Sequence, residues 1–209
     1  MVCALEIERR ALAGLERPGV EIHVSGMGAD AAAALAERLT LRPLRAMIAT
    51  GFCGALTPSL RVGDVVVAER VVHENTGRVF DADHLLLAAA SGRRGTLVSA
   101  GAVARTPADR AALHGLAVDL ESATLARAAN AVEIPFLAIR AVSDRYRDRI
   151  PDITGLLDHV GRPDRRRLAL FLVRNPREIP RLVRLGRGAN RAARGLAEHV
   201  GGLLTRLGV

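Results

Sequence analysis

The chain has 209 residues, 49% of them hydrophobic, which is enough for one globular domain with its own buried core and excludes a disordered chain. All 30 basic residues are Arg, and with 22 acidic residues the formal net charge is +8. Aromatic residues are limited to four Phe and one Tyr, so little can stack on exposed bases and no nucleic-acid partner is expected.

The positive charge lies at the C-terminal end. Residues 161–209 hold 12 Arg against three acidic residues, a net charge of +9, whereas residues 1–160 carry a net charge of −1. This asymmetry predicts an anionic partner for the tail, and a membrane surface is preferred to nucleic acid. We therefore expect a globular domain over residues 1–160 and an Arg-rich, amphipathic helical segment over residues 161–209 that packs on it.

Cysteine usage and apolar run lengths indicate where the protein works. Cys3 and Cys53 match no metal-ligand spacing, so no metal site is expected and a reducing cytoplasm is the simplest setting. Charged residues interrupt the first ten positions, which argues against a signal peptide. No apolar stretch reaches the ~18 residues needed to span a bilayer. We expect a cytoplasmic protein with at most peripheral membrane contact.

Strand and helix patterns alternate from the N-terminus onward, which predicts an α/β fold with a largely parallel sheet. Short β-branched or apolar runs indicate the strands, and runs of helix-forming residues indicate the helices between them. Strands are expected at Val2–Leu5, Val20–Val24, Ala46–Thr50, Val65–Ala68, Thr96–Ser99 and 135–142, and helices at Arg9–Leu15, Ala29–Leu39 and Leu85–Ala90, from Pro107, and after Glu121.

Glycines occur in two of the connections. Gly26 and Gly28 precede a helix, but the third glycine of a dinucleotide fingerprint is missing, so a tight strand-to-helix turn is the preferred interpretation. The segment Gly51–Leu56 is predicted to be a loop in which two glycines let the backbone approach a ligand closely.

Acidic side chains follow two of the expected strands. Asp119 and Glu121 open the Ala-rich helix, and the strand PFLAIRAV ends on Ser143 and Asp144. Because ligands bind at the carboxyl ends of strands in such sheets, these carboxylates are predicted to face one pocket. By itself, Ser143-Asp144 is also compatible with a simple cap on the following segment.

The tail predicts two helices, Arg165–Arg174 and Ile179–Leu207, with apolar residues on one stripe. Two interpretations remain open: an ordinary helical pair with a solvated face, or an interfacial segment on anionic lipid. The charged face is an Arg column spaced by three or four residues, formed by Arg174, Arg177, Arg181, Arg184, Arg187, Arg191 and Arg194.

Three motifs resemble a known superfamily, the purine nucleoside phosphorylases and the methylthioadenosine/adenosylhomocysteine nucleosidases. They are TGFCGAL followed by LRVGDVVV, then VDLESATLARAA, then IPFLAIRAVSD, over about residues 2–145. The resemblance implies a single-domain nucleoside phosphorylase-like fold, a central, mostly parallel mixed sheet flanked by helices, with residues 1–160 as the catalytic domain. It also implies a homo-oligomer, with a homodimer preferred. The tail, around NPREIP, is similar to that of the hopanoid-associated phosphorylase family, whose members remove adenine from adenosylhopane.

The resemblance implies a role for each acidic residue. Asp144 would protonate the departing purine, for which its pKa must be raised, and Ser143 would orient it. Glu121 would accept hydrogen bonds from the ribose hydroxyls. The remaining family positions that contact the nucleoside fall on Leu120, which packs on the sugar, on Asp119, where a Glu is usual, and on Val103 and Ala104, which flank the purine.

The residues that would position the nucleophile distinguish hydrolysis from phosphorolysis. CALEIER resembles the start of the nucleosidases, so Glu8 would activate water, with Arg140 near the same water; without the resemblance Glu8 is an ordinary surface residue of a first helix. Phe52 stands where phosphorylases and nucleosidases place Ser, and an apolar side chain cannot bind phosphate, although Arg9 or Arg10 could still contact it. The substrate-binding positions in this loop are Phe52, Cys53 and Gly54.

The preferred function is hydrolysis of adenosylhopane to adenine and ribosylhopane, without a cofactor. Phosphorolysis of the same or another purine nucleoside, with phosphate as co-substrate, is the alternative within enzymes. A non-catalytic, membrane-associated nucleoside-binding protein is the alternative of another class, because a fold does not determine a function.

Overall fold

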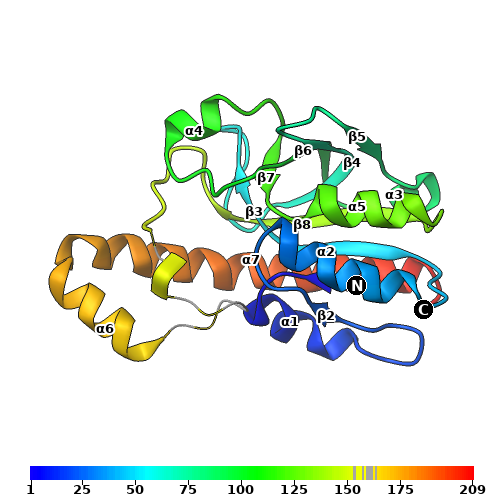
Figure 1. The fold of residues 1–209 in the computed structure, drawn as a ribbon, viewed down its shortest axis with the longest axis horizontal. Helices are drawn as coiled ribbons and strands as arrows, with labels where there is room; N and C mark the ends of the chain where they lie inside the picture. The colour runs from blue at the N-terminus through cyan, green and yellow to red at the C-terminus, as the bar shows by residue number, and fades with distance from the viewer. Residues whose placement is uncertain (153, 157, 159–161, 163) are drawn as a thin grey trace.

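The computed structural model describes all residues except 153, 157, 159–161 and 163 (Figure 1). In the described residues one sheet of eight strands runs in the order β2-β1-β3-β7-β6-β4-β5, and β8 pairs with both β3 and β4. Strands β3, β8, β4, β6 and β7 therefore form a closed circuit. The strands are β1 (Val2–Cys3), β2 (His23–Val24), β3 (Met47–Ala55), β4 (Val65–His73), β5 (Val79–Asp81), β6 (Arg93–Ser99), β7 (Ala117–Asp119) and β8 (Phe136–Asp144).

The sheet is mixed and mostly parallel, as predicted. The pairs β1–β2, β1–β3, β3–β8, β4–β6 and β6–β7 are parallel. The pairs β3–β7, β4–β5 and β4–β8 are antiparallel. The order of the strands follows from long crossovers, which local patterns do not encode.

Helices cover two separate apolar clusters. One cluster combines α2 and α5 with the strands, and the other combines α1, α3 and the C-terminal half of α7 with the strands. In Figure 1, α7 runs lengthwise beneath the strands. The helices are α1 (Glu6–Leu12), α2 (Ala29–Thr40), α3 (His84–Ala89), α4 (Pro107–Ala111), α5 (Ser122–Ala131), α6 (Arg165–Arg174) and α7 (Ile179–Arg206), with 3₁₀ turns η1 (Ala13–Leu15), η2 (Thr154–Leu156) and η3 (Pro176–Glu178).

The two halves of α7 have different surroundings. Side chains from Ala192 onward are in the core, and Ala192, Leu196 and Val200 are fully buried. The N-terminal half extends beyond the strands and forms a hairpin with α6 at the end of the molecule (Figure 1). The predicted boundary between residues 160 and 161 lies outside the described residues, and the C-terminal half of α7 completes the core of the body.

Several predicted boundaries were wrong, including the end of β4, which continues to His73 instead of ending at Ala68. The expected loop Gly51–Leu56 is a strand as far as Ala55, because β8 pairs with β3 up to Gly54 and Asp144. Helix α1 begins at Glu6 rather than Arg9, which places Glu8 in its first turn. Only His23–Val24 of the expected strand Val20–Val24 pairs with β1.

The lengths and hydropathies of the helices were compared with what a membrane-spanning helix requires. Among the described residues, no helix combines the length and the apolar character required to cross a bilayer.

Candidate active site

A cavity of about 280 Å³ opens where β3, β7 and β8 come together. Gly54 of β3 pairs with Val118 of β7 on one side and with Asp144 of β8 on the other. Arg140 is the one predicted site residue that does not line the cavity. The predicted residues that do line it are Glu8, Phe52, Cys53, Gly54, Val103, Ala104, Asp119, Leu120, Glu121, Ser143 and Asp144.

Asp144 is buried at the end of β8 and both of its carboxylate oxygens have partners. Ser143 Oγ lies 2.6 Å from Oδ1, and Arg110 forms an ion pair with Oδ2. Burial raises the pKa of Asp144 above its ordinary value, while Arg110 and the Ser143 hydroxyl act in the opposite direction. A carboxyl group with a raised pKa is suited to donating a proton.

The Ser143 hydroxyl has two acceptors within reach for its single proton. One is Asp144 Oδ1, and the other is the Cys53 carbonyl oxygen at 3.3 Å. When Asp144 is protonated, its O–H can donate to Ser143 Oγ while Ser143 donates to Cys53. Ser143 can therefore pair with Asp144 in both protonation states.

Arg110 is a residue that the sequence reasoning missed. It lies on α4, whose N-terminus is capped by Thr106, and only 1% of its surface is exposed. Besides pairing with Asp144, its guanidinium donates to the carbonyl oxygens of Ala104, at 3.1 Å, and Arg145. No local pattern distinguishes it from the other Arg residues of the chain.

Glu121 is held at the start of α5 by the glycine turn that precedes α2. The Gly28 N–H donates to Glu121 Oε1 at 2.8 Å, and φ is +91° at both Gly26 and Gly28. Burial raises the pKa of Glu121 to about 7, with Arg140 opposing this shift and Asp119 adding to it. The turn interpretation of these glycines is confirmed, and the turn also supplies a donor to the site.

Arg140 lies behind the cavity and holds the carboxylates in place. Its Nη2 is 2.7 Å from Asp119 Oδ2 and 3.8 Å from Glu121 Oε2. The guanidinium also donates to Ser122 Oγ at 3.0 Å and to the Thr50 carbonyl oxygen at 3.2 Å. With its N–H groups directed at protein acceptors, Arg140 orients Asp119 and Glu121.

Glu8 is buried rather than exposed, so the interpretation as an ordinary surface residue was wrong. Its Oε2 accepts from the N–H groups of Ala4 and Leu5 at 2.9 and 2.8 Å, and its Oε1 accepts from the Phe52 N–H at 2.7 Å. Burial raises the pKa of Glu8, and Arg140 is the largest opposing influence. These bonds cap α1 and fix the carboxyl group beside β3.

Two glycines of β3 make room for the ionisable side chains. A methyl group on Gly51, where φ is +144°, would lie 2.7 Å from both Glu8 Oε1 and Arg140 Nη1. One on Gly54 would lie 3.0 Å from Asp144 Oδ2. A strand advances ~3.3 Å per residue, so Glu8 and Asp144 contact β3 at points roughly 10 Å apart. Close approach of the site's own carboxyl groups is therefore a second reason for these glycines, beside the predicted approach of a ligand.

The remainder of the cavity wall is largely apolar. Phe52 and Leu120 are only partly buried there, and 41% of Val103 is exposed. Several contributors come from segments that the sequence reasoning did not assign to the site. They are Met27, Ile150, Leu185 and Ala189.

The acidic residues do not form a metal-binding cluster. Over the described residues, no group of three or more His, Cys, Asp or Glu side chains has an arrangement that could hold a metal ion. Four carboxyl groups line this partly apolar cavity: Glu8 of α1, Asp119 of β7, Glu121 at the start of α5 and Asp144 of β8.

Comparisons with known proteins connect this geometry to a family. Residues 14–160 match the model of the phosphorylase superfamily. The fold is similar to that of the 5′-methylthioadenosine/S-adenosylhomocysteine nucleosidase of Neisseria meningitidis solved with methylthio-immucillin-A, with a TM-score of 0.73, 20% identity, and 97% of this chain and 96% of that chain covered. It is also similar to the S-adenosylhomocysteine nucleosidase of Streptococcus pyogenes (TM-score 0.74, 21% identity, coverage 100% and 96%). A futalosine hydrolase mutant of Helicobacter pylori matches with a TM-score of 0.74 at 12% identity, with 98% and 96% covered.

Proposed function

The chain belongs to the phosphorylase superfamily, and from that premise we propose that it cleaves the N-glycosidic bond of an adenine nucleoside by attack of water. The observation that carries the proposal is the placement of Glu8, Glu121 and Asp144 around one cavity. This reaction needs a proton donor for the base, stabilisation of a cationic sugar, and a base for the nucleophile. Each requirement has a separate carboxyl group.

Asp144 is the proposed acid. As the bond between the sugar carbon and the purine nitrogen breaks, its electron pair enters the purine ring, and the Asp144 proton is transferred to a ring nitrogen. The base then leaves as a neutral molecule. Ser143 keeps the carboxyl oriented in both protonation states, and Arg110 stabilises the carboxylate left after proton transfer.

Glu121 is the proposed ribose ligand. A carboxylate that accepts hydrogen bonds from the sugar hydroxyls stabilises positive charge developing on the ring. Arg140 and the Gly28 N–H hold Glu121 in place before substrate binds. The shorter Asp119 pairs with Arg140 at 2.7 Å, so its proposed contribution is to orient that guanidinium.

Glu8 is the proposed general base. A water molecule next to it would attack the sugar carbon and give its proton to Glu8, so the products are free base and a sugar with a new hydroxyl group. Phosphorolysis is the less favoured alternative, because Phe52 offers no side-chain donor and Arg140 is already bonded to protein acceptors.

A lipid-linked nucleoside, adenosylhopane, is the proposed substrate. The resemblance of the tail to the hopanoid-associated family suggests it, and the apolar wall formed by Ile7, Phe52, Leu185 and Ala189 suits a bulky apolar substituent. We also expect a homo-oligomer, as the family resemblance implies.

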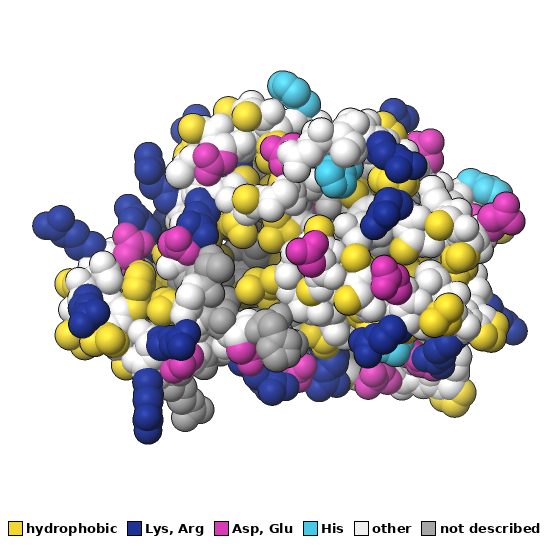
Figure 2. Space-filling model, viewed as in Figure 1, with side chains coloured by type: hydrophobic (Ala, Val, Ile, Leu, Met, Phe, Trp, Pro, Cys, Tyr) yellow, Lys and Arg dark blue, Asp and Glu magenta, His cyan; other side chains and the backbone are white. Residues whose placement is uncertain are grey.

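Peripheral contact with an anionic membrane is part of the proposal, because the substrate would reside in lipid. The α6–α7 hairpin places apolar and Arg side chains next to one another at the end of the molecule (Figure 2). Such a mixture favours an anionic interface. Its exposed apolar residues are Leu170 (50% exposed), Val173 (80%), Ile179 (42%) and Val183 (45%).

One incubation tests the reaction and its substrate. Purified protein is given adenosylhopane or adenosine in phosphate-free buffer, with and without added phosphate, and adenine release is measured. We expect release from adenosylhopane without phosphate, and slower release from adenosine. Strict dependence on phosphate would overturn hydrolysis, and equal rates on both nucleosides would overturn the lipid-linked preference.

A further inference from the structure

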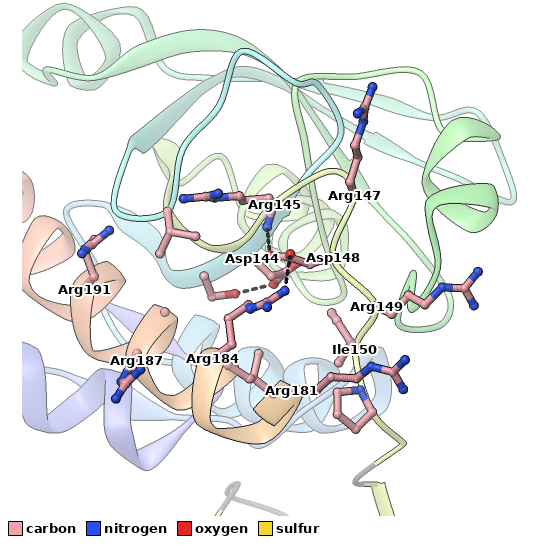
Figure 3. Close-up of a pocket in the computed structure, with 15 residues that line it drawn as sticks. Asp144, Arg145, Arg147, Asp148, Arg149, Ile150, Arg181, Arg184, Arg187 and Arg191 are labelled. Carbon is pink, nitrogen blue, oxygen red and sulfur yellow. Dashed lines mark hydrogen bonds and ion pairs between the residues drawn. The ribbon is translucent and has the colours of Figure 1, made fainter. Parts of the chain in front are cut away.

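A second cavity, of about 620 Å³, adjoins the nucleoside pocket and is lined mainly by Arg side chains. It lies between the segment that follows β8 and the N-terminal half of α7. In Figure 3, Arg184 points toward Asp144 and Asp148, while the other labelled Arg side chains lie around this point and extend in different directions. They are Arg145, Arg147 and Arg149 from the first segment and Arg181, Arg187 and Arg191 from α7.

The positive charge of this cavity is poorly compensated within the protein. Its two acidic residues are both engaged: Asp144 pairs with Arg110, and Asp148 lies 3.7 Å from Arg184 and accepts from the Arg145 N–H at 2.9 Å. Seven Arg and two Asp give the lining a net formal charge of +5. In the described part of the chain, no ion pair engages the side chains of Arg145, Arg147, Arg149, Arg187 or Arg191.

Two close contacts of α7, one with β8 and one with the turn at Gly63, fix the position of its Arg residues. A methyl group on Gly188 would collide with the Ser143 carbonyl oxygen, so α7 packs directly against the end of β8. A methyl group on Gly63, where φ is +96°, would lie 2.8 Å from Arg191 Cγ, so the stem of Arg191 rests on that turn. Like charges held on rigid, packed elements repel one another, and a bound anion would remove that cost.

We propose that this Arg-lined cavity binds a phosphate or phosphodiester anion beside the nucleoside pocket. The planar guanidinium fork matches phosphate oxygens bidentately, and several forks around one space suit a multiply charged anion better than a single carboxylate. The chain contains no Lys, so the gathering of Arg side chains around one cavity, and not the use of Arg in place of Lys, points to an anion.

The Arg-lined cavity is separate from Glu8, the residue proposed to activate the attacking water. It shares Ser143, Asp144, Ile150 and Leu185 with the nucleoside pocket, and Glu8 does not line it. The anion therefore lies on the acid side of the pocket. Its role next to a lipid-linked substrate rests on the proposed function, whereas its binding does not. A lipid headgroup and free phosphate share this chemistry.

Binding is tested on the full chain without nucleoside. Inorganic phosphate is titrated calorimetrically, and sedimentation is measured with phosphatidylglycerol vesicles and with phosphatidylcholine vesicles. The test variant is Arg149→Gln with Arg187→Gln, one residue from each element. The matched control is Arg38→Gln with Arg194→Gln, which removes the same charge from exposed positions outside the cavity. Circular dichroism verifies the fold of each.

We expect the test variant to bind the anion about ten-fold more weakly per lost contact, and the control to bind like the parent. Binding of inorganic phosphate identifies free phosphate as sufficient, and loss confined to phosphatidylglycerol vesicles identifies the headgroup. An equal loss in test and control variants, or no binding of either probe by the parent, overturns the site. Because this test measures binding and not turnover, anion binding can be confirmed even if the protein releases no adenine. Adenine release can likewise be confirmed even if no anion binds.

Discussion

The Arg110 guanidinium forms an ion pair with the Asp144 carboxylate, and both side chains are buried. Arg110 favours the charged form of Asp144, whereas burial favours the neutral form and raises the pKa. The balance between the two sets the highest pH at which Asp144 still carries the proton that the proposed reaction needs.

Replacing Arg110 should move this balance. In Arg110→Gln the influence that lowers the pKa of Asp144 is lost, so the basic limb of the pH–rate profile should move to higher pH. Adenine release measured across pH, together with thermal unfolding as a check on folding, tests it. A basic limb that stays in place or moves lower would show that Asp144 is not the titrating acid.

Asp144 and Glu8 should affect turnover more than binding. Asp144→Asn and Glu8→Gln each remove a proposed proton-transfer group with little change in shape, so adenine release should fall by roughly 10²–10⁴-fold. Binding of substrate, measured by calorimetry, should persist. Parental release rates in Asp144→Asn would exclude it as the acid, and an unaffected Glu8→Gln would leave Glu8 with its capping role alone.

The raised pKa of Glu121, about 7, predicts a pH-dependent stability. Between the ordinary Glu value and about 7 the folded state holds this proton while the unfolded state has lost it. The contribution of Glu121 to stability therefore falls as pH rises through this window. In Glu121→Gln the group cannot ionise, so above pH ~7 the variant should be about 1–3 kcal/mol more stable than the parent and bind substrate poorly. Urea unfolding at about pH 5 and pH 8 measures this, and a variant destabilised equally at both would refute it.

Packing of α7 on β8 should depend on Gly188. Gly188→Ala places a methyl group against the Ser143 carbonyl and should destabilise the protein by about 1–3 kcal/mol. Gly186→Ala is the matched control on the same helix, with nothing within 4 Å of the new methyl group, and should stabilise by about 0.5–1 kcal/mol. Thermal unfolding distinguishes them. A harmless Gly188→Ala would mean that the contact is loose.

Membrane contact should depend on the hairpin's exposed apolar residues. Val173→Ser should weaken sedimentation with phosphatidylglycerol vesicles by about ten-fold, because one buried Val contributes about 1.5 kcal/mol. Leu41→Ser, at an 87% exposed position after α2, is the control. Unchanged binding in Val173→Ser would favour an ordinary helical pair with a solvated face. Truncation is a poorer test, because it would also remove the buried half of α7.

Local pattern was enough for most of the elements, although it missed β5. It was also enough for the main acidic residues, because strand ends bring Asp144 and Glu121 to one pocket wherever such a sheet forms. It was not enough for Arg110, whose partner lies 34 residues away, or for the length of β3, which depends on pairing with β8. Gly51 was expected in a loop, because it follows a short apolar run and two glycines there would let a ligand approach the backbone closely. In the fold Gly51 lies within β3, where a Cβ atom would collide with both Glu8 and Arg140.

Helix α7 spans 28 residues without interruption, a length of about 42 Å. One half is fixed in the core and the other lines the Arg-rich cavity and leads to the hairpin. Because no break separates the two halves, the α7 residues that line the nucleoside pocket and those that enter the hairpin belong to one helix. A surface that binds the hairpin would therefore meet the pocket in a geometry set by this helix.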